Sequence, residues 1–151
     1  MPDDATPTSL LLQLQRVAAI CEADLATDLR TAGISQEEWR LLQVLADGTG
    51  WTMSDLSRTA VSAPPTATRI VDKLVSRAWA YRRVDVADRR RVVVYLSARG
   101  MRGIEPVLDA VAASRSRLES GLGARHWAAL VDGLTRIEEL DVRSMPEASH
   151  R

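Results

Sequence analysis

Hydrophobic residues recur every three or four positions through most of the chain, which is the spacing of the buried face of an α-helix. The first such stretch runs from Ser9 to about Arg30 and predicts one long amphipathic helix. A second helix is expected to begin after Ser35, because a Ser followed three residues later by Glu38 is the pattern of a capping box. It should end at the segment 47–50, whose glycines interrupt the helical pattern.

Two shorter helices follow, separated by a turn of a few residues. Thr52 is a suitable N-cap for a helix over residues 53–60. The pair Pro64-Pro65 fits only the first turn of a helix, because the amide hydrogens missing there have no intrahelical acceptor. We therefore expect the next helix to run from about Pro65 to about Ala78.

The hydrophobic period then changes from helical to alternating. Val92, Val94 and Leu96 alternate with their neighbours, and residues 81–84 can pair with this strand across a charged tip at 85–90. This pattern predicts a β-hairpin with a charged tip.

After Ser97 the helical period returns in two long helices, separated by Gly121-Leu122-Gly123, and residues 145–151 are expected to form a frayed tail. The pattern as a whole predicts a mainly α protein with a small β-hairpin wing. The expected architecture is a winged helix-turn-helix flanked by long N- and C-terminal helices.

Composition limits the class of protein. The chain has 151 residues, about the size of one compact domain. One cysteine and two histidines exclude a disulfide framework and a zinc-type cluster, so we expect neither a cofactor nor a metal. No apolar stretch approaches the roughly 20 residues that a membrane helix needs, and Met1-Pro2-Asp3-Asp4 lacks the basic start of a secretion signal. We expect a cytoplasmic protein without a membrane partner.

Charge is balanced over the whole chain, at twenty basic and twenty acidic residues, but not along it. The segment 52–100 has ten basic residues against four acidic ones, an excess of six that coincides with the two short helices and the hairpin. In a winged helix-turn-helix the second of these helices enters the DNA major groove, where cations and hydroxyls contact phosphates and base edges. The candidate DNA-contacting residues on this basis are Ser54, Arg58, Thr66, Thr68, Arg69, Lys73, Arg82, Arg83, Arg89 and Arg90.

Several of these segments resemble a known family. The stretch Thr66-Ala67-Thr68-Arg69-Ile70-Val71-Asp72-Lys73-Leu74, then Trp79, the segment Asp85-Val86-Ala87-Asp88-Arg89-Arg90 and the pair Leu96-Ser97 look like the MarR (multiple antibiotic resistance regulator) family. The most specific part is Asp-Arg-Arg in the wing with Leu-Ser about six residues on. The resemblance covers most of the chain and includes the order of its helices and wing.

The resemblance implies a bacterial transcriptional regulator that binds a palindromic operator in double-stranded DNA as a homodimer. It also suggests repression that is relieved by a small, often aromatic or phenolic, effector bound between the dimer helices and the DNA-binding lobe. By this resemblance the chain 1–151 is a single domain, with dimerisation helices at 8–31 and 98–143 and a winged helix-turn-helix DNA-binding lobe at 35–97.

Two wing residues receive roles from the resemblance. The family's minor-groove arginine falls on Arg90, and the acid that orients it falls on Asp88, which adds Asp88 to the candidate DNA site. An Asp two positions before an Arg on a tight turn could hold the guanidinium extended. The chain departs from the family at Ala78, where Gly is common, so the turn there must avoid positive φ or accept strain. Pro64-Pro65 also remove two backbone donors from the helix start.

Two other classes of protein compete with a DNA-binding protein as interpretations of the sequence. We do not expect an enzyme, because the sequence has no paired-carboxylate motif, phosphate loop or nucleophile with a plausible His partner. A winged-helix module that binds an acidic protein would use the same basic face, but such a module has no need of Arg90 at minor-groove depth. Cys21 lies on an apolar stripe without a basic neighbour, so a buried core position is favoured over a redox switch.

Overall fold

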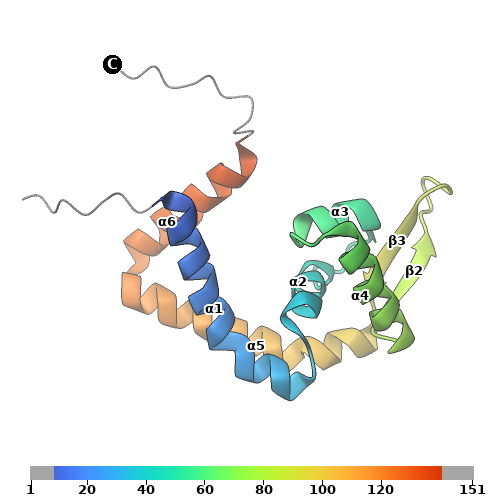
Figure 1. The fold of residues 1–151 in the computed structure, drawn as a ribbon, viewed down its shortest axis with the longest axis horizontal. Coiled ribbons are helices and arrows are strands. Elements are labelled where there is room, and N and C mark those ends of the chain that lie inside the picture. The colour runs from blue at the N-terminus through green and yellow to red at the C-terminus, as the bar shows by residue number, and fades with distance from the viewer. Residues whose placement is uncertain (1–8, 141–151) are drawn as a thin grey trace, which may run out of the picture. The chain divides into compact units, whose positions relative to one another are not determined.

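The structure, a computed structural model, describes residues 9–140 and confirms the expected class, mainly α with a small wing (Figure 1). Its elements in chain order are α1 (Leu10–Ala32), α2 (Gln36–Leu45), β1 (Trp51–Thr52), α3 (Met53–Thr59), α4 (Pro64–Ser76), β2 (Ala80–Val84), β3 (Val92–Leu96), α5 (Ala98–Leu122) and α6 (Ala124–Glu139). The chain divides into one compact unit up to Val111 and a second from Ala112, so the boundary falls within α5.

Local capping interactions set the starts of the short helices. At α2 the Ser35 hydroxyl accepts a hydrogen bond from the Glu38 amide (3.1 Å), and the Glu38 carboxylate accepts one from the Ser35 amide (2.8 Å). The predicted capping box is therefore confirmed. Thr52 caps α3 by accepting a hydrogen bond from the Asp55 amide (3.1 Å). Helix α4 begins at Pro64, one residue before the expected start, because its first turn accommodates both prolines.

A hydrophobic core forms within the first unit, where α1, α2, α3, α4, the sheet and the first part of α5 contribute side chains. Its largest fully buried side chains are Leu41, Leu42, Leu45, Leu56, Val71, Leu74, Val94, Ile104 and Val107. Helix α4 contributes Ala67, Ile70, Val71 and Leu74, which recur every three or four residues and confirm the helical stripe. Burial of a Leu or Val side chain contributes roughly 1.5–3 kcal/mol, so this shared core sets how α3 and α4 lie against each other.

A three-stranded antiparallel sheet in the order β1-β3-β2 forms the base of the wing. The predicted hairpin is confirmed, with Arg82 opposite Val94 and Val84 opposite Val92. The sequence did not indicate β1, because a strand of two residues has no hydrophobic period. Since β1 and β2 both pair with β3, Val93 and Val94 are buried together, whereas Val92 near the tip is exposed.

Two residues other than glycine adopt positive φ where the helices of the helix-turn-helix end. Val61 follows α3 with φ 49°, and Ala78 follows α4 with φ 55°. After α4 the Trp79 amide donates a hydrogen bond to the Leu74 carbonyl (2.8 Å), which completes a turn that usually contains glycine. The turn therefore accepts the strain of a left-handed residue with a Cβ. Because of this turn α4 ends at Ser76, two residues before the expected end.

The second unit consists of the C-terminal part of α5 and of α6. The two helices are separated at Gly123, as the glycines predicted, and the Arg115 guanidinium lies 5.7 Å from the centre of the Trp127 ring. Helix α6 has no buried residue. Residues 8 and 141–143 of the expected dimerisation helices, and the expected tail 145–151, lie outside the described residues. No helix within residues 9–140 is long and apolar enough to cross a membrane.

Candidate nucleic-acid interface

The N-terminal half of α4 is accessible on the side away from the core. Thr68 and Arg69 are exposed there, and Thr66 is half-buried. The Thr68 hydroxyl donates a hydrogen bond to the Pro64 carbonyl (3.0 Å). Ser54, exposed on the first turn of α3, lines the same surface depression as Thr68. The structure thus brings the hydroxyls of both short helices to one surface.

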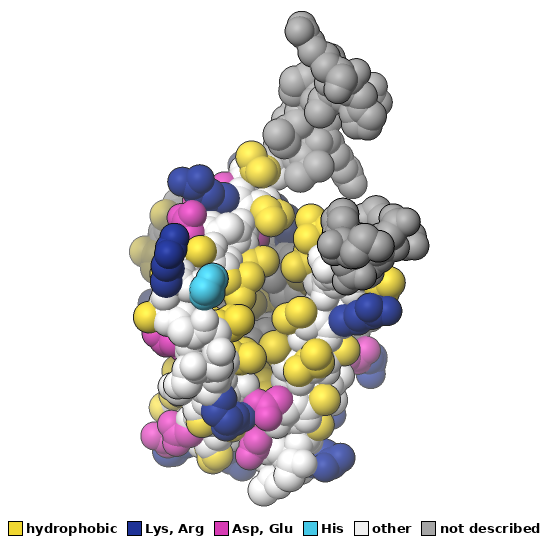
Figure 2. All heavy atoms as spheres, turned by 90° about the vertical axis from the view of Figure 1, so that its left-hand side faces the viewer, with side chains coloured by type: hydrophobic (Ala, Val, Ile, Leu, Met, Phe, Trp, Pro, Cys, Tyr) yellow, Lys and Arg dark blue, Asp and Glu magenta, His cyan; other side chains and the backbone are white. Residues whose placement is uncertain are grey.

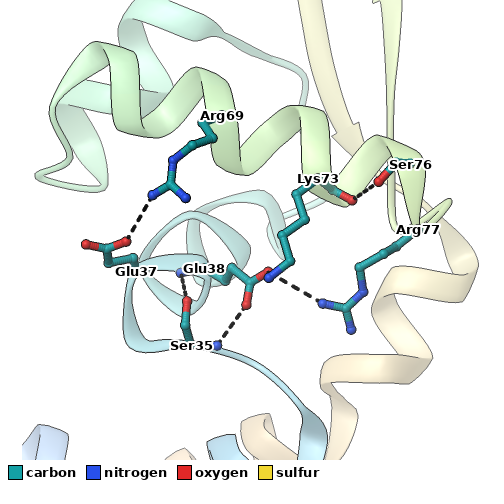
Figure 3. A network of polar contacts seen from close by, with 7 residues as sticks. All are labelled: Ser35, Glu37, Glu38, Arg69, Lys73, Ser76 and Arg77. Atoms are coloured by element: carbon teal, nitrogen blue, oxygen red, sulfur yellow. Dashed lines mark hydrogen bonds and ion pairs between the residues drawn. The ribbon is translucent and has the colours of Figure 1, made fainter.

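One flank of α4 faces acidic residues at the start of α2 (Figure 3). The Lys73 ammonium lies 2.9 Å from Oε1 of Glu38, and the Arg77 guanidinium lies 3.5 Å from the same oxygen. One turn earlier, Arg69 lies 3.6 Å from a carboxylate oxygen of Glu37. Two predicted DNA contacts, Arg69 and Lys73, therefore have carboxylate partners on α2.

Glu38 is 2% exposed, and its surroundings keep it ionised. Burial by itself raises the pKa of a carboxyl group, because it removes water from the charged form. The hydrogen bonds from Lys73 and from the Ser35 amide, with the charge of Lys73, outweigh burial and hold the pKa of Glu38 below its usual 4.5. At neutral pH Glu38 therefore carries a negative charge under α4, opposite the positive charges of Lys73 and Arg77.

The other flank of α4 is tied to the wing. The Arg82 guanidinium on β2 lies 2.7 Å from the Asp72 carboxylate on α4. On α3, Arg58 lies 2.7 Å from Asp55. A hydrogen bond from the Thr52 hydroxyl, and then the charge of Arg58, hold the pKa of Asp55 below its usual range. Arg58 and Arg82, two of the predicted DNA-contacting residues, are thus also in ion pairs.

The wing carries the predicted DNA-contacting cations that have no partner among residues 9–140. Arg83, Arg89 and Arg90 are exposed, and their side chains form no hydrogen bond or ion pair with any described residue. The Asp88 carboxylate accepts a hydrogen bond from the backbone amide of Arg90 (3.0 Å). The expected contact of Asp88 with the Arg90 guanidinium is therefore wrong, because a short Asp side chain reaches the amide two residues on more readily. Asp88 shapes the turn from which Arg90 projects.

A cavity of about 250 Å³ lies between α1 and α2. Its lining residues are Ala18, Cys21, Glu22, Leu25, Leu29, Gln36, Trp39, Arg40 and Gln43. Arg40 and Glu22 form an ion pair of 2.7 Å across it. Cys21 is half-buried in the cavity wall, so its expected place as a buried core residue is wrong. The short side chains on α1 leave room between the helices that the sequence pattern did not reveal.

The described residues contain no cluster of three or more potential metal ligands.

The fold and site together define a winged helix-turn-helix protein, and comparison with known proteins names the family. Residues 32–91 match the model of the MarR family. Over 141 residues the chain is 23% identical to the HTH-type transcriptional regulator FarR of Neisseria gonorrhoeae. The match covers 93% of this chain and 97% of that protein.

Solved structures agree in fold. The structure of NadR in complex with 4-hydroxyphenylacetate has a TM-score of 0.83 and 24% identity, covering 93% of this chain and all of that chain. The structure of the repressor CouR bound to a 23-mer DNA duplex has a TM-score of 0.71 and 22% identity, covering 85% of this chain and 92% of that chain. Residues 32–91 therefore match the MarR family, whose members are transcriptional regulators and not enzymes, and the resemblance stated from the sequence is confirmed.

Proposed function

We propose that this chain is a homodimeric, sequence-specific DNA-binding transcriptional regulator, a repressor that a small molecule releases from its operator. The observation that carries the proposal is the set of unpaired arginines on a wing beside an accessible recognition helix, α4. Exposed cations without acidic partners gain most from phosphates, because no existing ion pair has to be broken. CouR, a protein of the same fold, is bound to a DNA duplex in its solved structure.

In the proposed complex the two short helices and the wing make different contacts. The N-terminal part of α4, with Thr66, Thr68 and Arg69, enters the major groove, and Ser54 and Arg58 of α3 face the backbone. At the wing, Arg83 and Arg89 contact phosphates, and Arg90 enters the minor groove, where the negative potential favours a guanidinium. Asp88 holds the turn that presents Arg90.

The terminal helices supply the support for a dimer. Leu10, Val17 and Ile20 of α1 are more than half exposed, and α6 exposes Leu134 and Ile137 by more than a third. Figure 2 shows such hydrophobic side chains uncovered at the surface of the single chain. Soluble monomers rarely leave long apolar stripes in water, so we assign residues 8–31 and 98–143 to dimerisation and 35–97 to DNA binding. Sedimentation at micromolar concentration should give a dimer, and a stable monomer would contradict this assignment.

The cavity between α1 and α2 is the proposed effector site. Its apolar walls and the Trp39 ring suit a small aromatic molecule, and Arg40 offers a cation for an acidic group on it. NadR, which shares the fold, holds 4-hydroxyphenylacetate in its solved structure. The test is a titration of the protein–DNA complex with small aromatic acids, of which at least one should release the wild-type protein and should act less well on Arg40→Gln.

In vitro selection from a random duplex library tests DNA binding itself. The dimer should enrich an imperfect palindrome with half-sites about 10 bp apart, because two recognition helices meet successive major grooves. A winged helix used only for protein contact would enrich no sequence, and that result would contradict the proposed function.

A further inference from the structure

Glu38 places a buried carboxylate beneath the recognition helix, α4, and both α2 and α4 hold it there. Glu38 is the one Asp or Glu with a buried side chain among residues 9–140. A buried carboxylate is retained only where cations and hydrogen bonds compensate its lost hydration. Here the capping box holds Oε2 at the start of α2, and α4 supplies both cations to Oε1. The acid is thus fixed by one helix and bound by another (Figure 3).

The two cations make this contact directional. Lys73 and Arg77 are four residues apart, so they lie one above the other on the same flank of α4. Both reach the same Glu38 oxygen, at 2.9 and 3.5 Å. Two points on a helix that converge on one fixed point restrict its rotation about its axis as well as its shift along it. Lys73 is also the only lysine in the chain, where nineteen other basic residues are arginine.

A second ion pair holds the opposite flank. Asp72 precedes Lys73, and neighbouring residues point about 100° apart around a helix. Asp72 binds Arg82 of β2 at 2.7 Å, so α4 offers an anion to the wing and cations to α2. The exposed face between these flanks carries Arg69. Direct readout requires side chains placed within about 0.5 Å, so the rotation of α4 decides what reaches the bases.

We infer that Glu38 is a positioning residue for DNA recognition, and that Lys73 and Arg82 hold the recognition helix in place instead of contacting phosphates. The inference rests on the proposed function, because it concerns how the same lobe distinguishes one DNA sequence from another.

The test compares Glu38→Gln with Glu37→Gln. Both variants remove one negative charge from neighbouring positions, and Gln at 38 keeps the volume and the capping box. Glu37 is the matched control, since its side chain is 61% exposed and reaches Arg69 only at 3.6 Å. Fluorescence anisotropy would give the Kd for a duplex selected by the wild-type protein and for a scrambled duplex of the same length. Circular dichroism would establish that each variant is folded at the assay temperature.

We expect Glu38→Gln to lower the ratio of the two Kd values about tenfold, with affinity for the scrambled duplex equal to or slightly above wild type. Glu37→Gln should leave the ratio within about twofold of wild type. Equal ratios in the two variants would overturn the inference. A wild-type protein that does not discriminate at all would overturn the proposed function and the inference together, whereas a discriminating wild type with an equally discriminating Glu38→Gln overturns the inference alone.

A second variant decides the matter if Glu38→Gln does not fold. Lys73→Met leaves Glu38 with the Ser35 amide and Arg77. If Lys73 holds the helix, the ratio falls and the salt dependence of binding stays as in wild type. If Lys73 contacts a phosphate, both duplexes weaken alike and the log–log salt slope loses about 0.9, which would overturn the inference.

Discussion

The recognition helix and the wing tip both present basic side chains to the same expected ligand, DNA, but their electrostatic environments differ. On α4, Arg69 and Lys73 lie against Glu37 and Glu38, whereas Arg90 at the wing tip has no acidic partner among the described residues. A paired cation must give up its carboxylate before it can bind a phosphate, so its net gain is small. An unpaired cation gains the whole interaction. Under the proposed function, the wing supplies charge, and α4 supplies shape and hydrogen-bonding groups held at a fixed rotation.

Among the variants that test this comparison, removal of Arg90 from the wing should cause the largest loss of DNA affinity. Arg90→Ala should weaken binding to the selected duplex by roughly 1–3 kcal/mol, because a guanidinium in a narrow minor groove is lost. Arg90→Lys keeps the charge but not the planar group and should fall between alanine and wild type. An Arg90→Ala protein that binds the selected duplex as wild type does would remove the wing from the interface.

Arg82 and Arg83 test the comparison within one strand. Arg83 has no partner among the described residues, and Arg82 is bound to Asp72. Arg83→Ala should weaken all duplexes alike and reduce the magnitude of the log–log salt slope by about 0.9. Arg82→Ala should leave the slope unchanged and lower discrimination between duplexes. Identical slopes in the two variants would contradict the distinction between paired and unpaired cations.

Asp88 should contribute less to DNA affinity than Arg90 does, because it acts only by positioning Arg90. Asp88→Ala removes the acceptor of the Arg90 amide, so the turn loosens and Arg90 is presented less well. The loss of affinity should be smaller than that of Arg90→Ala, and the double variant should be barely weaker than Arg90→Ala alone, as residues that share one contact behave. Losses that simply add would show that Asp88 acts elsewhere.

The end of α4 allows a test without any change of charge. Ala78 has φ 55°, which disfavours a residue with a Cβ, and glycine removes that strain. Ala78→Gly should raise the free energy of unfolding by about 0.5–1 kcal/mol after the greater chain entropy of glycine is allowed for, as urea denaturation would measure. Its DNA affinity should stay at the wild-type value. A loss of stability would mean that the turn differs from the one described.

Acid should weaken the ion pair beneath α4. Because the pKa of Glu38 is lowered in the folded protein, its contribution to stability is complete above the usual 4.5 and is lost as pH falls through the folded value. The difference in urea midpoint between wild type and Glu38→Gln should therefore be constant near neutral pH and shrink below about pH 4.5. A difference that stays constant down to pH 2.5 would show that Glu38 is not held in its charged form.

Local signals in the sequence predicted most elements of the fold. Three such signals depend only on residues close together in the sequence: the Ser35 capping box, the alternating period of the hairpin and the glycines near residue 122. The structure contains the feature that each of them predicted. The strand β1 could not be found in the same way, because its two residues acquire their pairing only from β3. The sequence does not determine the φ of Ala78, because an alanine is compatible with two kinds of turn.

The candidate site was less predictable than the fold. The excess of basic residues indicated the segment 52–100 as a DNA-binding surface, but which of its cations are paired depends on contacts between distant residues. Glu38 and Lys73 are 35 positions apart and meet only when α2 and α4 share a core. The same reason applies to Cys21, since the cavity beside it exists only because α1 and α2 lie side by side with short residues between them.

The most direct test of the central claim is the binding of wild-type protein to its selected duplex and to a scrambled duplex over a range of salt concentrations. The selected duplex should bind at least about a thousandfold more tightly, as specific sites do in this class of interaction. The three unpaired wing arginines of each chain make six cations in a dimer, which predicts a log–log salt slope of about −5. Equal affinity for both duplexes with a slope near zero would contradict the assignment of this lobe to DNA.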